Sequence, residues 1–133
     1  MATARRHGVI ALYLTGSAAR GTATTLSDID FAAWLNPSLE PADRLPLRLE
    51  LLRVFTRILM TDEVDLAVLN DAAPAVRYHL LRDGRRLFSA DEGMRVELET
   101  RALKTYFDWL PALRLHQRVL KARLRQGRFA DGG

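Results

Sequence analysis

Three short apolar segments, each with polar residues at fixed places, constrain the fold of this chain most strongly. Val9 to Thr15 contains β-branched and aromatic residues and stops at Gly16, which is typical of a buried strand entering a tight turn. Asp28 to Leu35 has the pattern of a second strand, and Val64 to Leu69 that of a third. With 133 residues, 48% of them hydrophobic, the chain is long enough to bury a core, so we expect residues 1–133 to form one domain.

Helical periodicity separates the second and third strands. Asn36, Pro37 and Pro41 indicate a loop, and Pro46 is expected in the first turn of a helix. The apolar positions of that helix recur at helical spacing and are expected to pack on the sheet: Leu47, Leu51, Val54, Phe55, Ile58 and Leu59.

The last third of the chain is predicted to be mainly helical. A short helix from about Pro74 to Leu81 and a possible edge strand from Arg85 to Phe88 come first. Ser89 to Glu92 matches a Ser-x-x-Glu capping box that begins a long helical segment over about residues 90–126, which Pro111 should kink or split. The predicted class is therefore α/β (α+β), a small mixed β-sheet packed by helices.

Composition narrows the chemistry that a metal site could use. The chain has no cysteine, which excludes disulfides and thiolate-bound zinc, and its three histidines, His7, His79 and His116, are widely scattered. Any metal must then be held by oxygen. No apolar run has the length of a signal peptide or of a membrane span, so we expect a cytoplasmic protein with no membrane partner.

Positive charge is concentrated near the C-terminus. Residues 94–128 contain nine Lys or Arg and three acids, whereas the rest of the chain is slightly acidic. A basic helix can attract nucleic acid or an acidic protein surface, but it is more often a solvated face, so direct nucleic-acid binding is not our prediction.

Carboxylates near the strand ends indicate where chemistry takes place. Asp28 and Asp30 are two residues apart and project from one face of the second strand, while Asp65 interrupts the apolar third strand. Ionised carboxylates held a few ångström apart repel each other, and a divalent cation removes that conflict. Mg²⁺ suits such a site because it prefers oxygen ligands and keeps part of its shell for water and phosphates.

The turn at Gly16 and Ser17 supplies the complementary half of the site. Gly16 permits a backbone conformation that a side chain would forbid, and the hydroxyl of Ser17 can bind a phosphate oxygen. Arg20 either reaches the same triphosphate or is an ordinary surface charge. We therefore expect a metal-dependent site for a nucleoside triphosphate, with Asp28 and Asp30 on the metals and Asp65 completing one site or deprotonating the acceptor.

This arrangement resembles a known family. Gly-Ser, ten intervening residues, Asp-x-Asp and a later strand Asp are similar to the signature of the DNA polymerase β-like nucleotidyltransferases. The segments Gly-Ser-Ala-Ala-Arg-Gly-Thr-Ala, Ser-Asp-Ile-Asp and Val-Asp-Leu-Ala-Val-Leu, with the tail Tyr106 to Pro111, resemble more narrowly the minimal nucleotidyltransferases of the MNT or MntA type.

The resemblance implies a polymerase β-like nucleotidyltransferase fold and the role of an antitoxin. Members of this type are thought to transfer AMP from ATP to a tyrosine of a partner HEPN-domain ribonuclease toxin. By resemblance, Gly16 and Ser17 hold the triphosphate, and Asp28, Asp30 and Asp65 bind magnesium. The acceptor would belong to the partner, so Tyr13, Tyr78 and Tyr106 are not required, and the helix around Trp109 is a candidate partner surface.

Two alternatives remain at this stage. The chain could neutralise the toxin by stoichiometric binding without catalysis, or it could transfer a nucleotide to a small molecule such as an aminoglycoside. The second alternative is weakened by length, because 133 residues leave no room for a separate substrate-binding domain.

Overall fold

A mixed four-stranded sheet organises the protein in our computed structural model, which describes residues 8–21 and 28–126. The strand order is β3-β2-β1-β4. β1 pairs antiparallel with β2 and β4, and β2 and β3 are parallel. The strands are β1 (Val9–Thr15), β2 (Ile29–Leu35), β3 (Val64–Val68) and β4 (Arg85–Ser89). The predicted mixed sheet is confirmed, and β4 is an edge strand as expected.

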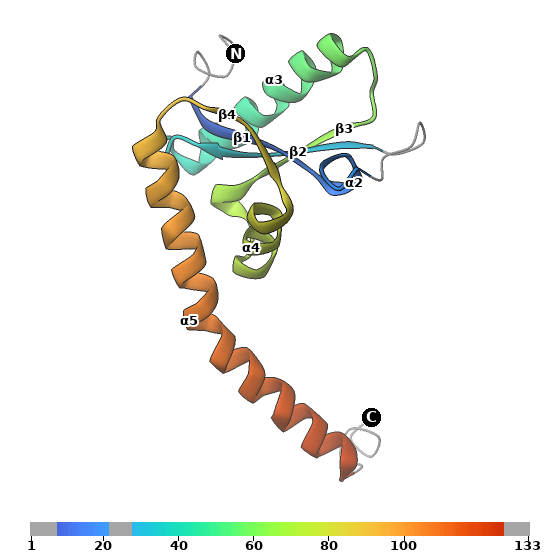
Figure 1. The fold of residues 1–133 in the computed structure, drawn as a ribbon, viewed down its shortest axis with the longest axis vertical. Helices are drawn as coiled ribbons and strands as arrows, with labels where there is room; N and C mark the ends of the chain where they lie inside the picture. The colour runs from blue at the N-terminus through green and yellow to red at the C-terminus, as the bar shows by residue number, and fades with distance from the viewer. Residues whose placement is uncertain (1–7, 22–27, 127–133) are drawn as a thin grey trace.

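Helices cover both faces of this sheet (Figure 1). α3 (Pro41–Leu59) lies on one face, and α4 (Pro74–Asp83) and the first part of α5 (Glu92–Arg125) lie on the other. A short helix, α2 (Gly16–Ala19), follows β1 directly, and a 3-10 turn, η1 (Leu69–Asp71), follows β3. Within the described residues, no helix is both long enough and apolar enough to cross a membrane.

Apolar side chains on the two faces of the sheet form two core clusters. Phe31 and Ala33 of β2 face α3 and join a cluster with the buried Leu51 of that helix. Ala32 and Trp34 face the opposite side and join a cluster with Leu98 and Ala102 of α5. Because side chains of a strand point alternately to the two faces, Asp30 shares the face of Ala32, as the sequence predicted.

The predicted start of the first long helix is wrong. α3 begins at Pro41 rather than near Pro46, because a proline fits the first helical position, where the backbone N–H has no partner in the helix. Pro46 lies inside the helix. The apolar stripe is also shorter than predicted, since Ile58 and Leu59 are exposed.

Smaller differences concern the ends of other elements. Asp28 precedes β2 instead of belonging to it, and Leu69 lies in η1 beyond the end of β3. The predicted capping box is wrong as well. Ser89 ends β4, and Asp91 caps α5 by accepting a hydrogen bond from the backbone N–H of Met94 at 3.0 Å.

α5 is a single helix that continues through Pro111. Its axis changes direction about halfway along (Figure 1), as expected for an internal proline, so the predicted kink is seen and the predicted split is not. The expected segment of about residues 90–126 corresponds to Glu92–Arg125.

Candidate active site

Gly16 directly follows β1 and has a conformation that few other residues adopt. Its φ is +65°, which an L-residue adopts only with strain. A Cβ at this position would also lie 2.6 Å from Oδ2 of Asp30, closer than real Cβ atoms approach another atom. Glycine is therefore favoured here for two reasons: the turn needs a positive φ, and a side chain would push the Asp30 carboxylate aside.

The strand register brings two of the predicted acids together. Asp30 is opposite Thr15 in the antiparallel β1–β2 pair and opposite Asp65 in the parallel β2–β3 pair. The backbone N–H of Ile29 also donates to the carbonyl of Glu63 at 2.9 Å, which fixes the start of β2 beside the start of β3. The turn and both strand ends thus meet at one end of the sheet.

Negative charge accumulates around Asp30. Partial burial raises the pKa of the Asp30 carboxyl, and the charges of Asp65 and Asp28 raise it further. Asp28, one residue before β2, is exposed. The three predicted acids are therefore electrostatic neighbours, an arrangement that a bound cation would stabilise.

Asp65 carries an additional contact that the sequence did not predict. Its Oδ1 accepts a hydrogen bond from the Nη2 of Arg48 at 2.8 Å and another from the backbone N–H of Leu66 at 2.8 Å. Arg48 also donates from Nε to the carbonyl of Leu66 at 2.7 Å. Arg48 of α3 therefore fixes the orientation of the Asp65 carboxylate at the edge of the sheet.

Two of the three predicted acids are suited to hold a magnesium ion. Within residues 8–21 and 28–126, no three His, Cys, Asp or Glu side chains are gathered closely enough to hold a metal. Mg²⁺ is usually bound by one or two carboxylates together with water and substrate phosphates. Asp28 and Asp30 can supply such a pair, whereas Asp65 would first have to leave Arg48.

A hollow of about 350 Å³ lies beside the Gly16 turn, between α2 and α4. Thr15, Gly16 and Arg20 line one side, and the α4 residues Ala75, Val76, His79, Leu80 and Asp83 line the other. Arg20 is exposed and lies near Asp83, whose pKa is lowered chiefly by a hydrogen bond from Arg82. The structure thus brings Arg20 beside the Gly16 turn, on the rim of a hollow with an apolar wall.

A second hollow, of about 420 Å³, borders Asp65 on the side of α3. Arg44 and Arg48 line it, and Arg44 forms an ion pair with Asp71. The sequence did not indicate that Arg44, Arg48, His79 or Asp83 would lie near the site. The four-residue spacing of Arg44 and Arg48 places both on one face of α3. The predicted helix began near Pro46 and left Arg44 outside it, so the sequence did not indicate that this face lies beside β3.

Solved toxin–antitoxin complexes share this fold. One, a crystal structure of a toxin–antitoxin with AMP-PNP, is 21% identical over 90% of this chain and 94% of that chain, with a TM-score of 0.69. A second, a tri-AMPylated Shewanella oneidensis HEPN toxin in complex with MNT antitoxin, is 19% identical over 90% and 91%, with a TM-score of 0.61. A third, the MntA-HepT toxin–antitoxin, is 20% identical over 90% and 92%, with a TM-score of 0.59.

The family is shown by a broader sequence match. No curated protein matches the sequence. Residues 2–93, which contain the Gly16 turn, all three acids and all four strands of the described sheet, match the family model described as polymerase beta, nucleotidyltransferase. This chain belongs to the polymerase beta nucleotidyltransferase family.

Proposed function

We propose that this chain is a Mg²⁺-dependent protein adenylyltransferase. In this role it transfers AMP from ATP to a tyrosine of a cognate HEPN ribonuclease toxin and so acts as an antitoxin. The observation that carries the proposal is the close approach of the Gly16 turn to Asp30, with Asp28 and Asp65 as charged neighbours. The toxin–antitoxin complexes of the same fold, one with AMP-PNP and one with an AMPylated toxin, support the choice of nucleotide and acceptor.

The nucleotide would lie across the Gly16 turn. Backbone N–H groups of the turn and the hydroxyl of Ser17 bind phosphate oxygens in this proposal, and Arg20 adds a positive charge. The hollow between α2 and α4 would take the nucleoside, because its wall of Ala75, Val76 and Leu80 offers apolar surface next to the phosphate site.

Asp28 and Asp30 would hold Mg²⁺ together with phosphate oxygens. When bound, the ion neutralises charge on the reacting phosphate and on the leaving pyrophosphate. In its absence the carboxylates repel each other, which is the cause of part of the raised pKa of Asp30.

The acceptor is activated by Asp65. The phenol oxygen of the partner's tyrosine forms a bond to the α-phosphorus, the bond from that phosphorus to the bridging oxygen breaks, and pyrophosphate leaves. The phenol proton passes to the Asp65 carboxylate, which Arg48 keeps oriented at 2.8 Å. Because ATP is consumed, we infer that the protein acts in the cytoplasm.

None of the chain's own tyrosines is a suitable acceptor. Tyr13 is buried, and its hydroxyl donates to Oε1 of Glu99 at 2.5 Å. Tyr78 and Tyr106 stack on each other with ring centroids 4.1 Å apart. Tyr13 joins β1 to α5, and Tyr78 and Tyr106 join α4 to α5, which agrees with an acceptor supplied by the partner.

The double variant Asp28→Ala with Asp30→Ala tests this proposal against neutralisation by binding. We expect it to lose both AMP transfer and protection of cells that produce the cognate HEPN toxin. Asp62→Ala with Asp43→Ala, two acids outside the site, is the matched control and should keep both activities. Full protection by the first variant with transfer abolished would show that binding alone neutralises the toxin.

A further inference from the structure

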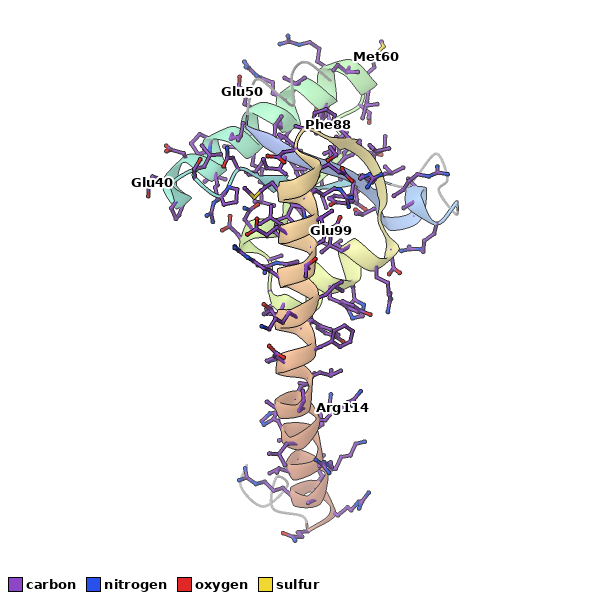
Figure 2. All side chains as sticks on the ribbon, turned by 60° about the vertical axis from the view of Figure 1, so that its left-hand side comes forward. Glu40, Glu50, Met60, Phe88, Glu99 and Arg114 are labelled. Carbon is purple, nitrogen blue, oxygen red and sulfur yellow. The ribbon has the colours of Figure 1, made fainter. Side chains whose placement is uncertain are left out.

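The second half of α5 is an arm that extends away from the fold. Ala102 is buried against the sheet and Tyr106 stacks on Tyr78 of α4, but the second half of α5 runs on past α4 (Figure 1). Arg114 lies on this projecting part, well beyond Glu99 (Figure 2). We call residues 110–125 the α5 arm, a helix about 24 Å long at 1.5 Å per residue. The family match ends at residue 93 and does not include it.

The arm carries an apolar seam with coiled-coil spacing. Leu110, Leu113, Leu120 and Leu124 follow one another at intervals of three, seven and four residues, with Gln117 at the remaining seam position. The seam continues the helix face that Tyr106 uses against α4. Leu124 is 61% exposed and the other three leucines are half-buried, and none of the four belongs to or packs against either core cluster of the described residues.

The residues that flank the seam are basic. Arg114 and Lys121 border one edge, and His116 and Arg123 border the other, the positions that form interhelical ion pairs in coiled coils. All four side chains are exposed, and there is no Asp or Glu between Trp109 and Gln126. Pairing with the arm of a second copy would oppose like charges at both edges, in either orientation, so self-association is disfavoured.

We propose that the α5 arm docks on a helix of the acceptor protein that has an apolar seam flanked by Asp or Glu. The identification of the partner as the acceptor rests on the proposed function, whereas the chemistry of its surface follows from the arm itself. RNA fits less well, because phosphate contacts would satisfy the cations but leave the leucine seam exposed to water. Docking through the arm would raise the local concentration of the acceptor near the acids.

Two double charge reversals on the α5 arm, which change the net charge by the same amount, test this docking proposal. Arg114→Glu with Lys121→Glu alters one edge of the seam, and Arg118→Glu with Arg125→Glu alters outward positions of the same helix. We expect the first pair to raise the Kd for the cognate HEPN protein by about tenfold or more, and the second by about twofold or less. Isothermal titration with the folded proteins measures both.

A second set of variants tests the seam itself. Leu113→Ser with Leu120→Ser should weaken binding strongly, whereas Leu115→Ser with Val119→Ser, which are 56% and 40% exposed and lie off the seam, should not. The proposal would be overturned if, among either the charge reversals or the serine variants, the seam variant and its control weakened binding equally, or if the seam variants did not weaken it. It would also be overturned if the arm caused dimerisation, or if the chain bound single-stranded RNA more tightly than it bound the HEPN protein.

Failure of the arm and failure of the proposed function are distinguishable. Asp28→Ala with Asp30→Ala should bind the HEPN protein as tightly as the wild type but transfer no AMP. The variant Leu113→Ser with Leu120→Ser should instead raise the KM for the acceptor and leave the KM for ATP unchanged. A variant that loses AMP transfer but binds normally has a defect in the acidic site, whereas a variant that loses binding has a defect in the α5 arm.

Discussion

Substituting Gly16 separates backbone strain from disruption of the acidic site. Gly16 has a φ of +65°, and an L-residue in that region costs about 1–2 kcal/mol. Gly21→Ala is a matched control, because Gly21 has a φ of +72° and no described atom lies within 4 Å of an added Cβ. Both variants should therefore lose about 1–2 kcal/mol of unfolding free energy, measured by urea denaturation.

Only Gly16→Ala should also disturb the chemistry. The new Cβ would lie 2.6 Å from Oδ2 of Asp30, and since real contacts begin near 3.0 Å, the carboxylate must move by about 0.4 Å or more. The atom displaced is the end of a flexible side chain, so the move adds little to the loss of stability. A misplacement of about 1 Å can cost about 10²-fold in rate, so we expect a loss of about tenfold or more in kcat/KM for AMP transfer.

The comparison between the two glycine variants decides the matter. Equal kcat/KM values for Gly16→Ala and Gly21→Ala would refute the view that Gly16 makes room for a working Asp30. A much larger loss of unfolding free energy in Gly16→Ala would show that Asp30 cannot move aside.

Three further predictions concern charge and burial. Asp30→Asn should raise the melting temperature of the metal-free protein at pH 7. The pKa of Asp30 is raised above 3.8 in the fold, so its ionised form destabilises the native state. The gain in melting temperature should disappear once the pH falls below about 3.8, where Asp30 is protonated in both the folded and the unfolded state. Glu92→Gln should reduce the loss of stability between pH 4.5 and 2, since a hydrogen bond from Arg95 lowers the pKa of Glu92 to about 2 and its contribution is lost as it protonates; an unchanged acid transition would contradict this. Tyr13→Phe should lower the unfolding free energy by about 1–2 kcal/mol, because the buried Tyr13 hydroxyl donates to Glu99 at 2.5 Å, and a change within error would show that this bond contributes nothing net.

The site was predictable where it depends on strand periodicity. A strand alternates faces, so the shared face of Asp30 and Ala32 and the interruption at Asp65 could be inferred from spacing alone. The turn at Gly16 was predictable for a different reason, because a buried strand that stops at Gly-Ser is typical of a tight turn.

Contacts between distant elements were not predictable in this way. Arg48 binds Asp65 because α3 begins at Pro41 and crosses the sheet at β3, and neither fact is encoded near Asp65. Asp91 rather than Ser89 caps α5, because Ser89 is already used by the edge strand. A local capping signal could not reveal this competition with β4.

The intact mass of a cognate HEPN toxin tests the proposed adenylylation most directly. After incubation with this chain, ATP and Mg²⁺, we expect the mass of the toxin to increase by one or more AMP units, and we expect no increase with the Asp28→Ala, Asp30→Ala variant. An unchanged mass with the wild-type protein, under conditions in which the two proteins bind, would contradict the proposed adenylylation.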